Sequence, residues 1–273
     1  MTEGSDELLV ELDDGVLKLT INRPDARNAL TYDLRQELVA QFQRADADLA
    51  VRCVVLTAAG DKAFCTGADL RSRPPSHPKP EGAPERATGD VSRMIATGWQ
   101  RVIASIMDCS KPVVGGVNGT AAGGGLHLAL ACDLVIAADN ARFISVFVRR
   151  GIAPDAGGAY ILPRLVGLQK AKEICFFGDD IAAADAERMG LINRVVPSAD
   201  LDKTVMEWAR RLASGPTVAI GTAKRLLNAS FDSSREQAFS DEAWGQEIVN
   251  SSADSTEGMK SFVERRDAEF KGW

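Results

Sequence analysis

The sequence predicts an α/β fold in which strands and helices alternate first and helices alone follow. Apolar runs such as 53–57 have the length and composition of strands buried on both faces. A glycine-rich stretch, 111–133, joins one apolar run to another of helical length, which indicates a strand, a tight turn and a buried helix. From residue 156 onward, nearly all apolar residues recur at helical spacing. We therefore expect a core at 1–197 and a helical C-terminal region at 198–273.

The composition favours some classes of protein and argues against others. The chain has 273 residues, 45% of them hydrophobic and 26% charged, and a net charge of −6. These values are typical of a soluble enzyme and argue against nucleic acid as a partner. Five scattered cysteines and two histidines leave few ligands for a metal, so none is expected. The acidic N-terminus does not resemble a targeting peptide, and no apolar run has membrane-spanning length, so we expect a cytoplasmic protein that does not enter membranes.

The N-terminal third predicts alternating strands and helices. Residues 8–21 alternate as in a hairpin that turns at 13–15. Thr31 is the expected N-cap of a helix that runs to about Ala45. Strands are expected at 53–57 and within 63–70, where the second strand ends at Gly67.

A proline-rich segment lies between these elements and the glycine-rich stretch. Residues 71–89 contain five prolines, which exclude regular structure and favour a mobile surface loop or a lid. A helix is expected at about 91–107. Two further strands, 134–137 and 142–145, follow the glycines. The helices expected after them are 156–165, 168–177, 182–189, 199–213, 217–230, 233–251 and 256–270.

The glycines do not fit three common motifs. Leu126 and His127 follow the last glycine, where a phosphate-binding loop needs Lys and Ser or Thr. The spacing is wrong for dinucleotide binding, and Gly-x-Ser-x-Gly is absent. Two separated turns remain, Gly67-Ala68 and 123–125. Their backbone amides can converge on one oxygen, as in an oxyanion hole.

Several motifs together resemble the enoyl-CoA hydratase/isomerase, or crotonase, superfamily. The resemblance covers about residues 8–271 and implies a spiral of ββα units, a CoA thioester substrate, no tightly bound cofactor, and a homotrimer or dimer of trimers. By motif position, the amides of Ala68 and Gly124 would hold the thioester oxygen. The motifs are Asn-Arg-Pro…Asn-Ala-Leu (22–30), Phe-Cys-Thr-Gly-Ala-Asp-Leu (64–70), Lys-Pro-Val-Val-Gly-Gly-Val-Asn-Gly-Thr-Ala-Ala-Gly-Gly-Gly (111–125), Cys-Asp-Leu (132–134), Gly-Leu-Ile-Asn (190–193) and Glu-Gly-Met-Lys-Ser-Phe (257–262).

Two glutamates that hydratases of this superfamily carry are missing. His127 and Phe147 stand in their places. Phe147 is expected to line the acyl pocket. His127 is either a neutral, packed residue or a group for polar contact or proton transfer, because histidine titrates near neutrality.

Asp155 is the remaining candidate for acid–base chemistry. From the residues alone it is either the N-cap of the following helix or a catalytic group. The surrounding Gly-Ile-Ala-Pro-Asp-Ala-Gly-Gly (151–158) is most similar to the epoxyphenylacetyl-CoA isomerase and dienoyl-CoA isomerase branch. That resemblance implies that Asp155 carries protons, while it can also be a cap. The expected reaction is double-bond isomerisation through an enolate.

Family position also implies a binding site for CoA. Two segments would contribute near the thioester, namely the loop at 27–29 and the backbone at 68–71. Two residues of the last helix would reach adenine and phosphate from a neighbouring subunit, unless they serve only in packing and as a solvated charge. The residues concerned are Arg27, Ala29, Ala68, Asp69, Leu70, Arg71, Gly124, Phe262 and Arg265.

Three other functions remain open at the level of sequence. The first is a hydratase of divergent mechanism that uses His127 or Asp155. In the second, Asp155 is a covalent nucleophile, as in chlorobenzoyl-CoA dehalogenases, but Gln100 lies near the place of the histidine that this branch uses. The third is a catalytically silent acyl-CoA-binding protein.

Overall fold

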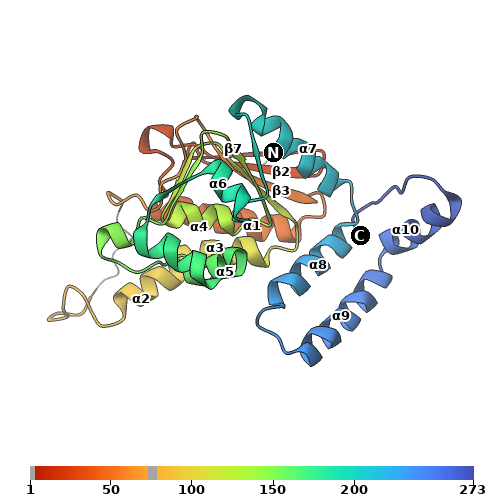
Figure 1. The fold of residues 1–273 in the computed structure, drawn as a ribbon. Helices are drawn as coiled ribbons and strands as arrows, with labels where there is room; N and C mark the ends of the chain where they lie inside the picture. Colours follow the sequence, from red (N-terminus) through yellow and green to blue (C-terminus); the bar gives the residue numbers. More distant parts are fainter. Residues whose placement is uncertain (1–3, 73–78) are drawn as a thin grey trace.

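The computed structural model describes residues 4–72 and 79–273 and contains two sheets (Figure 1). The larger sheet has six strands in the order β1-β2-β3-β5-β7-β10. Only the β1–β2 hairpin is antiparallel, and it turns through Asp14 and Gly15, which both have positive φ. The strands are β1 (Leu8–Asp13), β2 (Val16–Ile21), β3 (Cys53–Ala58), β5 (Val113–Val117), β7 (Leu134–Ala138) and β10 (Arg194–Val196).

The smaller sheet contains the second strand of each repeating unit. Its order is β4-β6-β8-β9, and only β9 is antiparallel to its neighbour. The pairs β3–β4, β5–β6 and β7–β8 thus each place one strand in each sheet, and this repetition is the predicted ββα spiral. The strands are β4 (Ala63–Cys65), β6 (Thr120–Ala122), β8 (Arg142–Ile144) and β9 (Asp180–Ala182).

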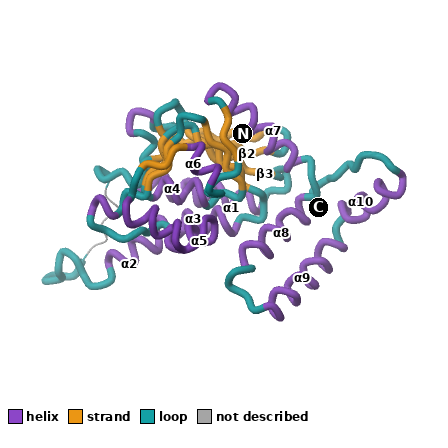
Figure 2. The backbone as a smooth tube through the Cα atoms, in the orientation of Figure 1, coloured by secondary structure: helices purple, strands orange, loops and turns teal. Residues whose placement is uncertain are grey.

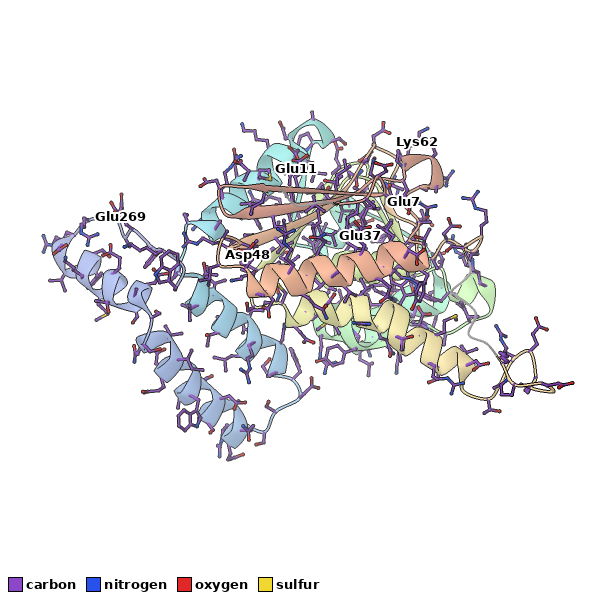
Figure 3. The ribbon with its side chains drawn as sticks, turned by 180° about the vertical axis from the view of Figure 1, so that it is seen from behind. Glu7, Glu11, Glu37, Asp48, Lys62 and Glu269 are labelled. Carbon is purple, nitrogen blue, oxygen red and sulfur yellow. The ribbon has the colours of Figure 1, made fainter. Side chains whose placement is uncertain are left out.

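Helices cover both faces of the large sheet. Alternation along β3 directs Val54 and Leu56 into the main core and Cys53 and Val55 to the other face, where α7 packs. The view from behind shows α1 beside the β1–β2 hairpin, with Glu37 and Glu11 labelled on them (Figure 3). The helices of this body are α1 (Tyr32–Ala47), α2 (Asp90–Ile95), α3 (Arg101–Asp108), α4 (Gly124–Leu130), α5 (Gly158–Phe177), α6 (Ala183–Arg188) and α7 (Leu201–Ala213).

The last three helices form an arm that projects from this body (Figures 1 and 2). They are α8 (Thr217–Ala229), α9 (Arg235–Asn250) and α10 (Ala253–Glu264). The chain end returns toward the body, where an Nη atom of Arg52 donates to the carbonyl of Phe270 at 3.1 Å. A cleft of about 900 Å³ lies between α8–α9 and the body, lined by residues that include Lys111 and Ile248.

Several predicted boundaries were wrong. The helix expected at 91–107 is divided into α2 and α3 by a π-helical turn at 96–100. One helix, α5, replaces the two expected at 156–177, with a break at Gly167, whose φ is +75°. The last helix ends at Glu264 instead of 270, because Arg265 adopts a left-handed conformation. Part of the expected mobile loop, 73–78, lies outside the described residues, and 79–89 contains neither helix nor strand.

Candidate active site

The two turns predicted to form an oxyanion hole lie side by side. Leu30 donates its amide to the carbonyl of Gly67 at 2.8 Å and accepts from the amide of Asp69 at 3.0 Å, so Ala68 lies in an irregular strand pairing. Gly67 has a φ of +96°, and a Cβ added there would be 3.5 Å from the amide nitrogen of Gly124. The structure therefore brings together residues that are separated by more than fifty positions.

Both predicted amides are without an acceptor in the described part of the chain. Within the described residues, neither Ala68 nor Gly124 donates its amide to a protein acceptor. Ala68 is exposed, and Gly124 is the first residue of α4, where helix amides have no internal partner. This is an arrangement of donors that can hold an oxygen bearing negative charge.

The glycines around this site are required by close packing. A Cβ on Gly124 would lie 2.7 Å from the ring of Trp99, and one on Gly125 only 2.0 Å from the carbonyl oxygen of Cys65. Any larger residue at Gly125 would thus push α4 away from β4. The glycine triplet allows the helix to begin directly against the strand that precedes Ala68.

Arg23 and Asn28 organise the neighbouring loop, which contains the expected CoA residues Arg27 and Ala29. The buried Asn28 side chain donates to the carbonyls of Ala59 at 3.0 Å and Ala63 at 2.7 Å. Arg23 donates to the carbonyl of Ala29 and forms ion pairs with Glu7 and Asp69 at 2.9 and 3.0 Å. Arg23 was not among the site residues predicted from the sequence.

The Ala68–Arg71 segment is fixed through Asp69. The amide of Arg71 and the side chain of Arg23 both donate to this carboxylate, and they hold the pKa of Asp69 below its usual value. Leu70 and Arg71 are highly exposed. The segments 27–29 and 68–71 are therefore adjacent, because Arg23 contacts both, but Ala29 is buried.

His127 is packed as a neutral side chain. It is fully buried, its ring stacks on Phe147 with 5.3 Å between centroids, and a Cβ on Gly158 would fall 2.0 Å from its Cε1 atom. Neither ring nitrogen has a hydrogen-bond partner among the described residues. Burial lowers the pKa of His127 to about 4, although the nearby backbone of Asp155 opposes this shift weakly. These contacts favour the packed interpretation.

Asp155 is half-buried and lies just before the start of α5, but its side chain does not cap that helix. The N-cap is Gly157, with no side-chain hydrogen bond, and Asp155 contributes only its carbonyl, to the amide of Gly158 at 3.0 Å. The interpretation of Asp155 as an N-cap was therefore wrong. Burial raises the pKa of its carboxyl group, while the charge of Arg35 opposes this shift. A carboxylate with a raised pKa is suited to taking up and returning a proton.

A model of the enoyl-CoA hydratase/isomerase family matches residues 11–273. The 1,2-epoxyphenylacetyl-CoA isomerase of Escherichia coli K12 is 33% identical, over 97% of this chain and 98% of its own. The crotonyl-CoA hydratase of Syntrophomonas wolfei is 35% identical, again over 97% and 98%. The crystal structure of an enoyl-CoA hydratase from Bacillus anthracis covers 98% of this chain with a TM-score of 0.88 and 32% identity.

The chain belongs to the enoyl-CoA hydratase/isomerase family. The resemblance seen in the motifs is thereby confirmed at the level of the crotonase superfamily, and so is the fold. The names of the relatives include both hydratases and isomerases, so they do not distinguish between the two activities.

Two expected residues of this crotonase-family chain lie far from the turns. Phe262 is 82% exposed on α10, and Arg265 is the exposed left-handed residue that ends it. Figure 1 shows α10 in the projecting arm, away from α4, whose first residue is Gly124. Within one chain they do not join Ala68 and Gly124.

Arg35 and Trp99 are site residues that sequence reasoning missed. Trp99 is buried against Gly124, and the guanidinium of Arg35 lies 5.4 Å from its ring centroid. A weak signal was present, because Arg35 stands near the start of α1, where the helix dipole disfavours a cation. Gln100, next to Trp99, is exposed.

The described residues contain no group of three or more His, Cys, Asp or Glu side chains that could hold a metal ion. Among them there is also no helix with the length and apolar character needed to cross a bilayer.

Proposed function

We propose that the protein moves the double bond of an enoyl-CoA thioester, with Asp155 as the proton carrier. The observation that supports this function is that Asp155 is the one carboxylate at the expected acid–base positions. The other two positions carry His127, which is neutral and packed, and Phe147. One carboxylate is sufficient for isomerisation, in which the same proton can leave and return.

In this mechanism the Asp155 carboxylate removes a proton from C2 of a 3-enoyl-CoA. The electron pair moves onto the thioester oxygen and forms a dienolate, to which the amides of Ala68 and Gly124 donate. Asp155 then returns the proton to C4, so that the double bond lies between C2 and C3 and the thioester carbonyl is restored. Each oxyanion donor is typically worth about 3 kcal/mol.

Hydration is the second candidate, because relatives of similar identity are named as hydratases. Adding water requires one group to activate the water and another to protonate carbon. His127 could serve as one of them only if its ring became accessible, because it is fully buried. This requirement makes isomerisation the simpler use of the site.

The same proposal extends to substrate binding and assembly. Arg27, Ala29 and the Ala68–Arg71 backbone would hold CoA near its thioester, and Phe262 and Arg265 would contact adenine and phosphate from a neighbouring copy. This arrangement requires a homotrimer or a dimer of trimers. Coenzyme A enters only as part of the substrate, with no tightly bound cofactor.

The test is to incubate the protein with a 3-enoyl-CoA and a 2-enoyl-CoA and to follow double-bond position and water addition. We expect isomerisation by the wild type and a decrease in kcat of about 10²- to 10⁴-fold for Asp155→Asn. The kcat of the wild type should fall at acidic pH with an apparent pKa above the usual aspartate range.

Asp179→Asn is the matched control, because this aspartate is on the surface with its side chain 84% exposed. Unchanged isomerisation by Asp155→Asn would contradict the proposed role. A water adduct formed at a comparable rate would favour the hydratase, and CoA binding without turnover would indicate a silent protein.

A further inference from the structure

Arg35, near the start of α1, lies against two aromatic rings. Its guanidinium carbon lies 5.4 Å from the ring centroid of Trp99 and 5.9 Å from that of Tyr32. The guanidinium also lies beside Gly98, where an added Cβ would be in ordinary van der Waals contact with it, 3.7 Å from an Nη atom. Contact with ring faces leaves the in-plane N–H groups of an arginine free to donate.

These donors are unused within the described residues. The Arg35 side chain forms no hydrogen bond or ion pair there, and its Nε atom is buried without a partner. Arg23, by contrast, donates to a carbonyl and pairs with two carboxylates. Buried polar groups are nearly always paired, so the unpaired Nε of Arg35 favours an anionic ligand at this position.

The position of Arg35 points to the acyl end of the substrate. Trp99 connects it to Gly124, whose amide faces the expected thioester oxygen. Burial lowers the pKa of Arg35 and the charge of Asp155 opposes this shift, yet within the described residues the two side chains do not form an ion pair. The cations on the expected CoA surface, Arg27 and Arg71, belong to other segments.

We propose that Arg35 binds a carboxylate at the far end of the acyl group, so that the preferred substrates are CoA thioesters of dicarboxylic acids. The proposal rests on the proposed function, because that function places the acyl chain beside Asp155. The planar fork of arginine matches a carboxylate through two parallel hydrogen bonds.

The test uses saturated thioesters, which bind without reacting and so separate this inference from turnover. Succinyl-, glutaryl- and adipyl-CoA are compared by calorimetry with butanoyl-, pentanoyl- and hexanoyl-CoA, which have the same carbon numbers but methyl ends. For at least one pair we expect the carboxylated ligand to bind about 10- to 100-fold more tightly. Arg35→Met should abolish that preference without changing affinity for free CoA, and Arg35→Lys should restore part of it.

Arg44→Met is the matched control, because this exposed arginine lies on the same helix and its loss removes the same charge. It should retain the preference. The inference is overturned if no pair shows a preference, or if Arg35→Met weakens free CoA equally, which would make the partner a CoA phosphate. It is also overturned if Arg35→Met changes only kcat and its pH profile with neutral acyl groups, which would make Arg35 a positioning residue for Asp155. Lost turnover with an intact binding preference would contradict only the proposed isomerisation.

Discussion

At the scale of single residues, His127 shows how the surroundings determine protonation. Histidine ordinarily titrates near neutrality, but this ring is enclosed by Phe147 and Gly158, so burial lowers its pKa to about 4. The unfolded chain takes up this proton near pH 6.5, whereas the folded chain does so only near pH 4. Between these values the unfolded state binds more protons, so stability falls as the pH decreases.

His127 should therefore contribute to the pH dependence of the free energy of unfolding. Replacing His127 with Phe should remove about 2 kcal/mol of the loss in unfolding free energy between pH 7 and pH 5. Urea unfolding of both proteins at the two pH values measures the effect. Other titrating groups contribute equally to both proteins and cancel. Parallel pH dependences would show that the ring is not buried and neutral in solution.

At the scale of elements, helix α8 is attached to the body through one buried cation. Lys224 pairs with Asp133 at 2.8 Å and donates to the carbonyls of Ile106 and Lys111 at 2.9 and 3.3 Å. Burial raises the pKa of Asp133, and the charge of Lys224 opposes that shift. This network connects the arm to α3 and to the strand β5 that leads to the glycine turn.

Breaking the network should be costly. Lys224→Met leaves the Asp133 carboxylate and two carbonyls without their partner, and we expect a loss of about 3–5 kcal/mol in unfolding free energy. Chemical denaturation measures the change. Lys203→Met provides the comparison, since its side chain is 76% exposed and its loss should have little effect. A small effect of Lys224→Met would mean that α8 is held mainly by other contacts.

At the scale of the whole molecule, the arm exposes many large apolar side chains. Large apolar patches indicate interaction surfaces, and the cleft between the arm and the body leaves room for a neighbouring copy. The exposed apolar residues of α8–α10 and the loop after α8 are Leu227, Phe231, Phe239, Trp244, Ile248, Met259, Phe262 and Val263.

We expect assembly to depend on this surface. Light scattering should give a mass of about three or six times the 29.2 kDa of one chain. Trp244→Glu should shift it toward the monomer, because a charge would be buried at the contact. Leu9→Glu, on the exposed face of the edge strand β1, should leave the mass unchanged. A monomeric wild type would contradict both the assembly and the proposed contribution of Phe262 and Arg265.

The sequence by itself determined the fold class, most of the helices and the residues of the two turns. These features depend on local patterns, namely apolar period, glycine spacing and N-capping, and Thr31 indeed caps α1 with a 3.1 Å hydrogen bond from Leu34. It did not determine whether Asp155 caps a helix, whether His127 is charged or what Arg35 contacts. Only the tertiary structure decided these points, because burial and the proximity of distant segments control a group's charge and its partners, and neither is a local property of the chain.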